Sequence, residues 1–338
     1  RATATRFPDD ARVHYYLGRA CSALGYTQEA QEALKSATRC DSTLAEAHLE
    51  LGQLLEVQGN YEEALEAYRT AITASGGNPS YEAKAGLICA RMQRYEEAIQ
   101  HLQQATNRGI HDASLYAALG EGLQSRGTHE QAMAAYRQAT DIEPSNADHH
   151  AALARCALAL GRLNEAKKEA EEATRLAPRE PEHLALKASI LVALKRPLSA
   201  VEILRRAVTL PHGDKHRTDL GAAYRLAGNL EAAQEELAAA VGLHPEDPKV
   251  HLELATLFSE QEDWQSAMRE LQEALKLGPS DQSARLQLAQ VLDRQGMTDE
   301  ACEQLLKAAE TTPMNASVHY SLGLMQEKLG GLTSARDS

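Results

Sequence analysis

The chain has 338 residues, and its 48 Asp or Glu against 35 Lys or Arg give a formal net charge of -13 at pH 7. Such a charge repels a phosphate backbone, so nucleic acid is excluded as the expected partner. No apolar run reaches the roughly 18 residues that a membrane span needs, and five cysteines without a CxxC pair suit reduced thiols, so we expect a cytoplasmic protein with no direct membrane insertion.

The first predicted elements share a helix start that recurs along the chain. GNYEEALEAY at residues 59–68 returns 34 residues later as QRYEEAIQHL at 93–102. One alanine in this segment keeps an interval of 34 residues, with a single 33 between Ala200 and Ala233. The alanines in this register are Ala30, Ala64, Ala98, Ala132, Ala166, Ala200, Ala233, Ala267, Ala301 and Ala335. A tenfold match in register indicates an internal repeat.

Each repeat is predicted to contain two helices. Twelve residues before each of these alanines lies a glycine or another alanine, and seven residues after each of the first nine lies a further alanine. We infer that the two helices cross so closely that only a hydrogen atom or a methyl group fits between them. Proline should end the second helix, because it lacks the amide proton and disfavours helix at the residue before it. These prolines are Pro144, Pro178, Pro245, Pro279 and Pro313.

A helix-turn-helix of 34 residues with small residues at positions 8, 20 and 27 and proline at position 32 resembles the tetratricopeptide repeat. The resemblance implies an all-α fold, a right-handed superhelical α-solenoid whose first helices line a concave groove that holds peptides or partner proteins. Residues 1–10 would be the tail of a preceding repeat, residues 11–315 nine full repeats, and residues 316–338 a tenth repeat cut inside its second helix. The repeats begin at Ala11, Ala45, Pro79, Ala113, Ala147, Pro181, Asp214, Pro248, Gln282 and Ala316.

The sixth repeat and the two ends depart from the pattern. In the sixth repeat Lys187 replaces the usual leucine, Pro197 opens the second helix, and one residue is missing. We expect this repeat to be the weakest. An end repeat leaves its apolar side in water, so we also expect that the natural chain continues in both directions and that the ends fray or stack end to end on another copy.

The groove is where the resemblance places binding, at positions 2, 5, 6, 9, 12 and 13 of each first helix, which form one stripe. In repeats five to seven this stripe turns apolar and carries two arginines. The predicted peptide-binding residues are Arg155, Leu158, Ala159, Leu186, Val192, Ala193, Ala222, Arg225 and Leu226. Such a strip suits an amphipathic or extended peptide with acidic residues. The competing interpretation is that these residues are simply good helix formers.

Other candidate chemistry is sparse. His212 and His216 have the spacing of a metal pair but lie in a Pro- and Gly-containing connection, which predicts a solvated loop. We expect Cys40 to be exposed and the remaining cysteines, Cys21, Cys89, Cys156 and Cys302, to be core residues. Histidine recurs at position 4 as His14, His48, His150, His251 and His319, which indicates a shared packing environment rather than a shared ligand. We therefore expect no catalytic residue, metal or cofactor.

The sequence thus predicts a non-catalytic protein-protein interaction scaffold. The alternative is the targeting or regulatory arm of a larger enzyme, or of a secretion or assembly machine, whose active domain lies outside these residues. Both hypotheses imply a protein or peptide partner, and the sequence does not choose between them.

Overall fold

The computed structural model describes residues 9–311 and 315–336, and within these ranges every regular element is a helix. The first helices of the repeats are α2 (Ala11–Ala23), α4 (Ala45–Val57), α6 (Pro79–Arg91), α8 (Ala113–Ser125), α10 (Ala147–Ala159), α12 (Pro181–Ala193), α14 (Arg217–Leu226), α16 (Pro248–Glu260), α18 (Gln282–Arg294) and α20 (Ala316–Arg336). The second helices are α3 (Thr27–Cys40), α5 (Tyr61–Ala74), α7 (Tyr95–Asn107), α9 (His129–Ile142), α11 (Leu163–Leu176), α13 (Pro197–Val208), α15 (Leu230–Leu243), α17 (Trp264–Leu277) and α19 (Thr298–Thr311).

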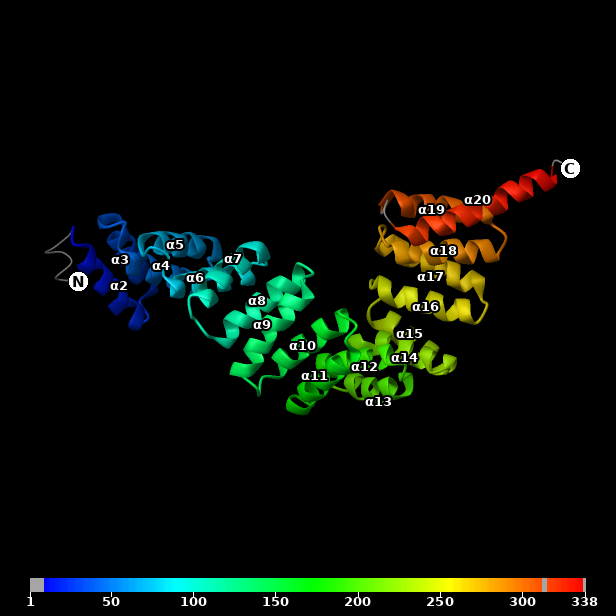
Figure 1. Ribbon diagram of the computed structural model, residues 1–338, viewed down its shortest axis with the longest axis horizontal. Coiled ribbons are helices and arrows are strands. Elements are labelled where there is room, and N and C mark those ends of the chain that lie inside the picture. The colour runs from blue at the N-terminus through cyan, green and yellow to red at the C-terminus, as the bar shows by residue number, and fades with distance from the viewer. Residues whose placement is uncertain (1–8, 312–314, 337–338) are drawn as a thin grey trace. The chain divides into compact units, whose positions relative to one another are not determined.

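The helices form two compact parts, an N-terminal part over Arg1–Leu176 and a C-terminal part over Ala177–Ser338. In each part the first and second helices of a repeat pack as a pair, and successive pairs stack on one another (Figure 1). The predicted α-solenoid of helix-turn-helix repeats is therefore confirmed within each part. The second helices α9, α11, α15 and α17 end two residues before the predicted proline, while Pro313 lies outside the described residues.

The alanine register forms the core of each pair. The alanines at positions 20 and 27 are fully or almost fully buried in all nine full repeats, whereas Ala335 lies outside the residues whose side chains are described. The residue at position 8 faces the side chain at position 24 of the same repeat, and a small residue at position 8 is opposite a large one at position 24. A Cβ atom built on Gly52 or Gly120 would lie 2.7 or 2.8 Å from the ring of Tyr68 or Tyr136. Glycine at position 8 therefore makes room for tyrosine at position 24.

The turn between the two helices requires a left-handed residue. Position 15 has a positive φ in all nine full repeats, and it is glycine in six of them. The other three repeats place Gln93, Lys195 and Glu262 there, with φ of 58°, 60° and 61°. A side chain in this conformation costs about 1 kcal/mol or more. These three turns are therefore strained relative to the six that contain glycine.

Two repeats differ from the expected boundaries. The seventh begins with a 3-10 turn, Asp214–His216, before α14, because the chain folds back tightly at Gly213, where a built Cβ would lie 1.9 Å from the carbonyl oxygen of Ala207. In the tenth repeat the predicted start of a second helix is wrong, because α20 continues as one helix from Ala316 to Arg336. No described atom lies within 4 Å of a Cβ built on Gly323, so no second helix packs there to stabilise a turn.

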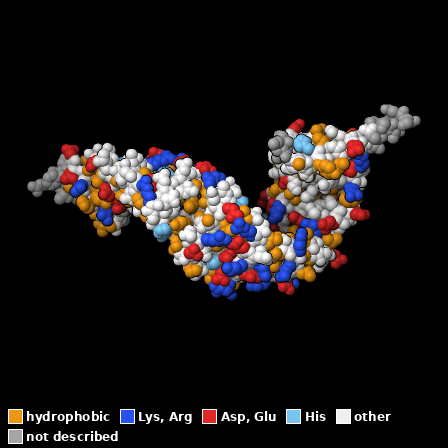
Figure 2. Space-filling view, viewed as in Figure 1, with side chains coloured by type: hydrophobic (Ala, Val, Ile, Leu, Met, Phe, Trp, Pro, Cys, Tyr) orange, Lys and Arg blue, Asp and Glu red, His pale blue; other side chains and the backbone are white. Residues whose placement is uncertain are grey.

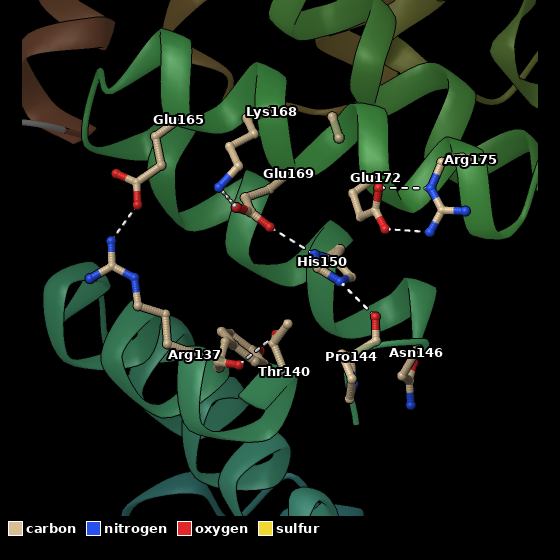
Figure 3. Close-up of polar contacts among 12 residues, drawn as sticks. Arg137, Thr140, Pro144, Asn146, His150, Glu165, Lys168, Glu169, Glu172 and Arg175 are labelled. Carbon is tan, nitrogen blue, oxygen red and sulfur yellow. Dashed lines mark hydrogen bonds and ion pairs between the residues drawn. The ribbon is translucent and has the colours of Figure 1, made fainter. Parts of the chain in front are cut away.

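Ion pairs join the second helices of neighbouring repeats in the N-terminal part, and the pattern repeats every two repeats. Between repeats two and three, Arg94 pairs with Glu62 at 3.4 Å and Arg69 pairs with Glu97. Between repeats four and five the equivalent pairs are Arg162 with Glu130 and Arg137 with Glu165, the latter drawn in Figure 3. Each exposed pair adds at most about 1 kcal/mol, so its main effect is on the match between neighbours.

We predict that residues 181–213 open before the neighbouring repeats. Lys195 and His212 both hold a positive φ there, and α13 has only 12 residues. The strain and the shorter interface should lower the free energy of local opening. Hydrogen exchange followed by mass spectrometry measures this directly. Protection over 181–213 equal to that over 214–281 would contradict the prediction.

Candidate functional site

The predicted peptide-binding residues lie on three first helices. Arg155, Leu158 and Ala159 belong to α10 in the N-terminal part, and the other six belong to α12 and α14 in the C-terminal part. All nine are exposed or half-buried, so each presents some surface to solvent. Leu226 is the most exposed of the predicted leucines, at 49%. The structure brings them together only within each part.

The two predicted arginines have different environments. Arg225 pairs with Glu253 at 3.2 Å and with Glu260 at 2.6 Å, both on α16, and only 12% of its side chain is exposed. Beside it, Lys249 forms an ion pair with Asp219 at 2.5 Å. The charges on the inward face of α14 and α16 therefore satisfy one another, and Arg225 already has two carboxylate partners.

A hollow of about 770 Å³ lies between α8 and α10, on the inward positions of repeats four and five. Arg155 is exposed in it, and no side chain of the described residues forms a hydrogen bond or ion pair with it. The residues that line the hollow are Tyr95, Ser114, Ala117, Ala118, Glu121, Gln124, Ser125, His129, Tyr136, Glu143, Asn146, Asp148, His149, Ala152 and Arg155. Of the predicted binding residues, this hollow contains Arg155.

The floor of the hollow is ordered by hydrogen bonds. The hydroxyl of Tyr136 donates to Oε1 of Gln124 at 3.3 Å, and the thiol of Cys156 donates to the same oxygen at 3.7 Å. Burial raises the pKa of Tyr136, so its hydroxyl stays protonated at neutral pH. Gln124 is thereby held in one orientation at the base of the hollow, which favours a preformed binding surface.

A second hollow, of about 940 Å³, lies on the inward face of α16, α18 and α20 in the C-terminal part. It contains Trp264, the only tryptophan in the chain, together with amide and hydroxyl groups such as Gln287, Gln290 and Ser259. Lys328 and Asp293 form an ion pair of 2.5 Å within it. Trp264 is therefore an intrinsic fluorescent reporter for this hollow alone.

In several repeats the side chain at position 4 contacts the side chain at position 23, an arrangement that we call the polar clip. The sequence indicated the recurring histidine at position 4 but not its partner. In Figure 3 the ring of His150 lies between Glu169 and the carbonyl of Pro144, with Nδ1 2.7 Å from the carboxylate and Nε2 3.1 Å from the carbonyl oxygen. His251 makes the same two contacts, with Glu270 and Pro245, at the same distances. These contacts confirm the shared packing environment predicted for the two histidines.

The same clip occurs with other residues in three more repeats. Arg217 donates to Glu236 at 2.6 Å, and Arg285 donates to Gln304 at 3.2 Å. In the third repeat the pair is reversed, with the buried Glu82 at position 4 and His101 at position 23, 2.6 Å apart. Position 4 alone does not indicate this pair, because its signal lies in the two residues 19 positions apart in the same repeat.

The pKa of His251 follows from these contacts. Burial lowers it, but the hydrogen bonds with Glu270 and with the carbonyl of Pro245 outweigh burial and raise it above the ordinary value. Both ring nitrogens face acceptors, so the doubly protonated ring satisfies both. The two contacts join α16 to α17 and to the connection that precedes α16.

The remaining candidate groups lie where the sequence placed them. Cys40 is exposed, and the other four cysteines, Cys21, Cys89, Cys156 and Cys302, are buried free thiols. Burial raises the pKa of Cys89 and of Cys156 to about 11, so both remain protonated at neutral pH. His212 is exposed, and His216 contacts Asp219 at 3.3 Å. Across the described ranges, no three His, Cys, Asp or Glu side chains are placed to hold a metal ion.

Lys or Arg and Asp or Glu side chains are mixed over the described surface on the face drawn in Figure 2. Within residues 9–311 and 315–336, no helix combines the length and the apolar character required to cross a membrane.

Solved structures that resemble this one share its fold. PilF of Pseudomonas aeruginosa matches with a TM-score of 0.51 and 24% identity, over 64% of this chain and 97% of its own. Cut9, from the APC/C hetero-tetramer Cut9–Hcn1, matches with a TM-score of 0.55 and 14% identity, over 95% of this chain and 84% of its own. A monomeric mutant of IFIT1 with m7Gppp-AAAA matches with a TM-score of 0.56 and 18% identity, over 84% of this chain and 74% of its own.

Comparison of the sequence with curated proteins gave no match. Two family models described as tetratricopeptide repeat do match it, one at residues 123–190 and 258–324 and the other at 22–79 and 218–281. Together they cover more than half of the chain. The chain belongs to the tetratricopeptide-repeat family.

Proposed function

We propose that the chain is a non-catalytic interaction scaffold that binds an extended segment of a partner protein on the inward face of its first helices. The observation that supports this proposal best is the hollow between α8 and α10, which is open, preformed and lined by both small apolar and polar side chains. An extended peptide can lie along such a surface, because Ala117, Ala118 and Ala152 leave room for its backbone. The buried, protonated thiols fit a reducing compartment, and we place the protein in the cytoplasm.

The predicted residues on α10 in the N-terminal part, and those on α12 and α14 in the C-terminal part, are two further segments of the proposed surface, each within its own part. Leu158, Leu186 and Leu226 carry their apolar character, and all three retain exposed surface. The ion pairs of Arg225 support the inward face of α14 without filling the position of Leu226. We propose that each of these segments binds apolar side chains of a partner, while the hollow binds polar ones.

A capped RNA is disfavoured as the ligand. IFIT1 holds m7Gppp-AAAA in the similar structure. Here the net charge is -13, and Glu121, Glu143 and Asp148 all line the hollow, so a phosphate backbone would be repelled. A peptide partner requires no such neutralisation.

The proposal predicts that filling the hollow stops binding. Ala118→Trp puts an indole ring into it, and the matched control Ala134→Trp puts the same ring on the exposed face of α9. Partners captured from a native cell extract by the tagged full chain, and quantified by mass spectrometry, should fall at least tenfold for Ala118→Trp and remain for Ala134→Trp. The triple change of Leu158, Leu186 and Leu226 to Glu should also abolish capture, with unchanged helical content by circular dichroism. Equal capture by all four proteins would place the functional surface elsewhere.

A further inference from the structure

The hollow formed by α16, α18 and α20 in the C-terminal part holds one charge that has no partner. Its two carboxylates are paired, Glu260 with Arg225 at 2.6 Å and Asp293 with Lys328 at 2.5 Å. Arg294 also lines the hollow, is exposed, and forms no hydrogen bond or ion pair with a described side chain. Among the residues that line this hollow, the charge that remains for a ligand is therefore a guanidinium.

Two side-chain amides lie in a row with this guanidinium. Gln287, Gln290 and Arg294 occupy positions 6, 9 and 13 of α18, a spacing of three and four residues that places them on one face of the helix. Thr256 donates to Oε1 of Gln287 at 3.4 Å, while Nε2 of Gln287 and both amide atoms of Gln290 have no hydrogen-bond partner in the described part of the chain. Because an amide side chain has both donors and an acceptor, these two can pair with the backbone of an extended peptide.

The apolar walls of this hollow are an observation independent of its polar groups. Trp264 and Met325 are half-buried, and each packs against the hydrophobic core of the eighth and ninth repeats while it also lines the hollow. The surface that both side chains keep outside the core is therefore available to an apolar side chain of a ligand. A tryptophan ring offers a large area for such a contact.

We infer that this hollow recognises an extended segment of a partner protein in which an aspartate or glutamate lies within about three residues of a large apolar residue. The carboxylate binds Arg294 by charge-assisted hydrogen bonds, the amides of Gln287 and Gln290 pair with the backbone, and the apolar side chain packs on Trp264. The spacing follows from the helix, because the seven residues from Gln287 to Arg294 rise about 10 Å, which an extended peptide covers in about three residues.

This inference rests on the proposed function, the binding of extended segments on inward faces, and adds a site in the C-terminal part with its own chemistry. The hollow between α8 and α10 lies in the N-terminal part, so each hollow can be tested alone. The net charge of -13 opposes the approach of an acidic segment. At physiological salt the screening length is about 8 Å, so Arg294 acts on a bound carboxylate more strongly than distant charges do.

The test is a selection of random dodecapeptides on the full chain, displayed on phage and fused through their C-termini so that all their carboxylates are side chains. Counter-selection uses Gln290→Tyr, which puts a ring into the hollow from an exposed position. The enriched pool should contain Asp or Glu within about three residues of a large apolar residue. A synthetic amidated peptide from that pool should shift the emission maximum of Trp264, the only tryptophan of the chain, to shorter wavelength.

The same titration measures the contribution of the guanidinium. Arg294→Gln should weaken binding at least tenfold, since it removes the charge and keeps a polar side chain. The matched control Arg205→Gln removes a cation from an exposed position of α13 outside the hollow and should bind as the unmodified chain does.

The outcomes separate the inference from the proposed function. Enriched peptides whose binding survives Arg294→Gln, or that leave the emission of Trp264 unchanged, would overturn the inference. A pool with no enrichment over Gln290→Tyr would also overturn it, while binding in the hollow between α8 and α10 would still be decided by capture with Ala118→Trp. Equal weakening by Arg294→Gln and Arg205→Gln would show that net charge alone is responsible, and would overturn the inference too.

Discussion

Replacement of Gly120 by leucine is expected to destabilise the fourth repeat by on the order of 3 kcal/mol, because the new side chain has no space beside Tyr136. A single Cβ at this position already lies 2.8 Å from the tyrosine ring, and Tyr136 is 6% exposed, so the ring cannot move into solvent without breaking the core. Urea denaturation of the full chain, followed by circular dichroism, measures the loss.

The matched control is the same substitution at Gly242. This residue lies in α15, and no described atom is within 4 Å of a Cβ built on it. Leucine there should stabilise the helix by up to about 1 kcal/mol, since glycine is a poor helix former. If the two variants unfolded at the same urea concentration, close packing at position 8 would not be what holds the helix pairs together.

Removal of His101 is expected to have the second large effect. Glu82 is 3% exposed and pairs with Nδ1 of His101 at 2.6 Å, so His101→Ala leaves a buried carboxylate without its partner. Leaving a buried polar group without its hydrogen-bond partner in this way costs about 1 to 3 kcal/mol. Native-state hydrogen exchange should show the loss of protection in α6 and α7, because stability in a repeat array is local.

The reversed double variant Glu82→His/His101→Glu is the control for this pair. It places histidine at position 4 and glutamate at position 23, as His150 and Glu169 are in the fifth repeat. The ring-to-carboxylate distance is 2.7 Å in that pair and 2.6 Å in the pair of His101 and Glu82. We expect it to recover protection to within about 1 kcal/mol of the unmodified chain. A double variant no more stable than His101→Ala would show that the surroundings of Glu82, and not the pair itself, determine its contribution.

The helix boundaries could be predicted closely because they depend on residue size within one repeat. The first helices begin at the predicted residue in every repeat but the seventh, since glycine or alanine at position 8 and alanine at position 20 define the crossing. The turn at position 15 is harder to predict from the sequence. Gln93, Lys195 and Glu262 have a positive φ there, a conformation that is usually adopted by glycine.

The candidate binding surface could be predicted only in part, because its hollow and its ion pairs are formed by residues of two neighbouring repeats. The sequence identified the exposure of Arg155 and Leu226, but not the ion pairs that Arg225 makes with residues 28 and 35 positions later in the next repeat. The hollow itself depends on how alanines on α8 and α10 leave space above Tyr136, and a single helix does not show this. The acidic side chains of the hollow were likewise not predicted, because the predicted binding residues are those of the apolar stripe and its two arginines.

The two-repeat pattern of ion pairs has a consequence for how such a chain can change in length. Repeats three and five carry the same charged residues at the same positions, Arg94 and Glu97 in one and Arg162 and Glu165 in the other. If residues 79–146 were deleted, Arg162 would face Glu62 and Glu165 would face Arg69, so the junction would keep both ion pairs. Loss of the third repeat alone would place Thr128 and Gln131 at that junction and keep neither pair, and loss of the fourth alone would keep only one, between Arg162 and Glu96. A loss of two repeats therefore preserves the ion pairs of the new junction, although the loss of residues 79–146 also removes α8 and with it one wall of the hollow between α8 and α10.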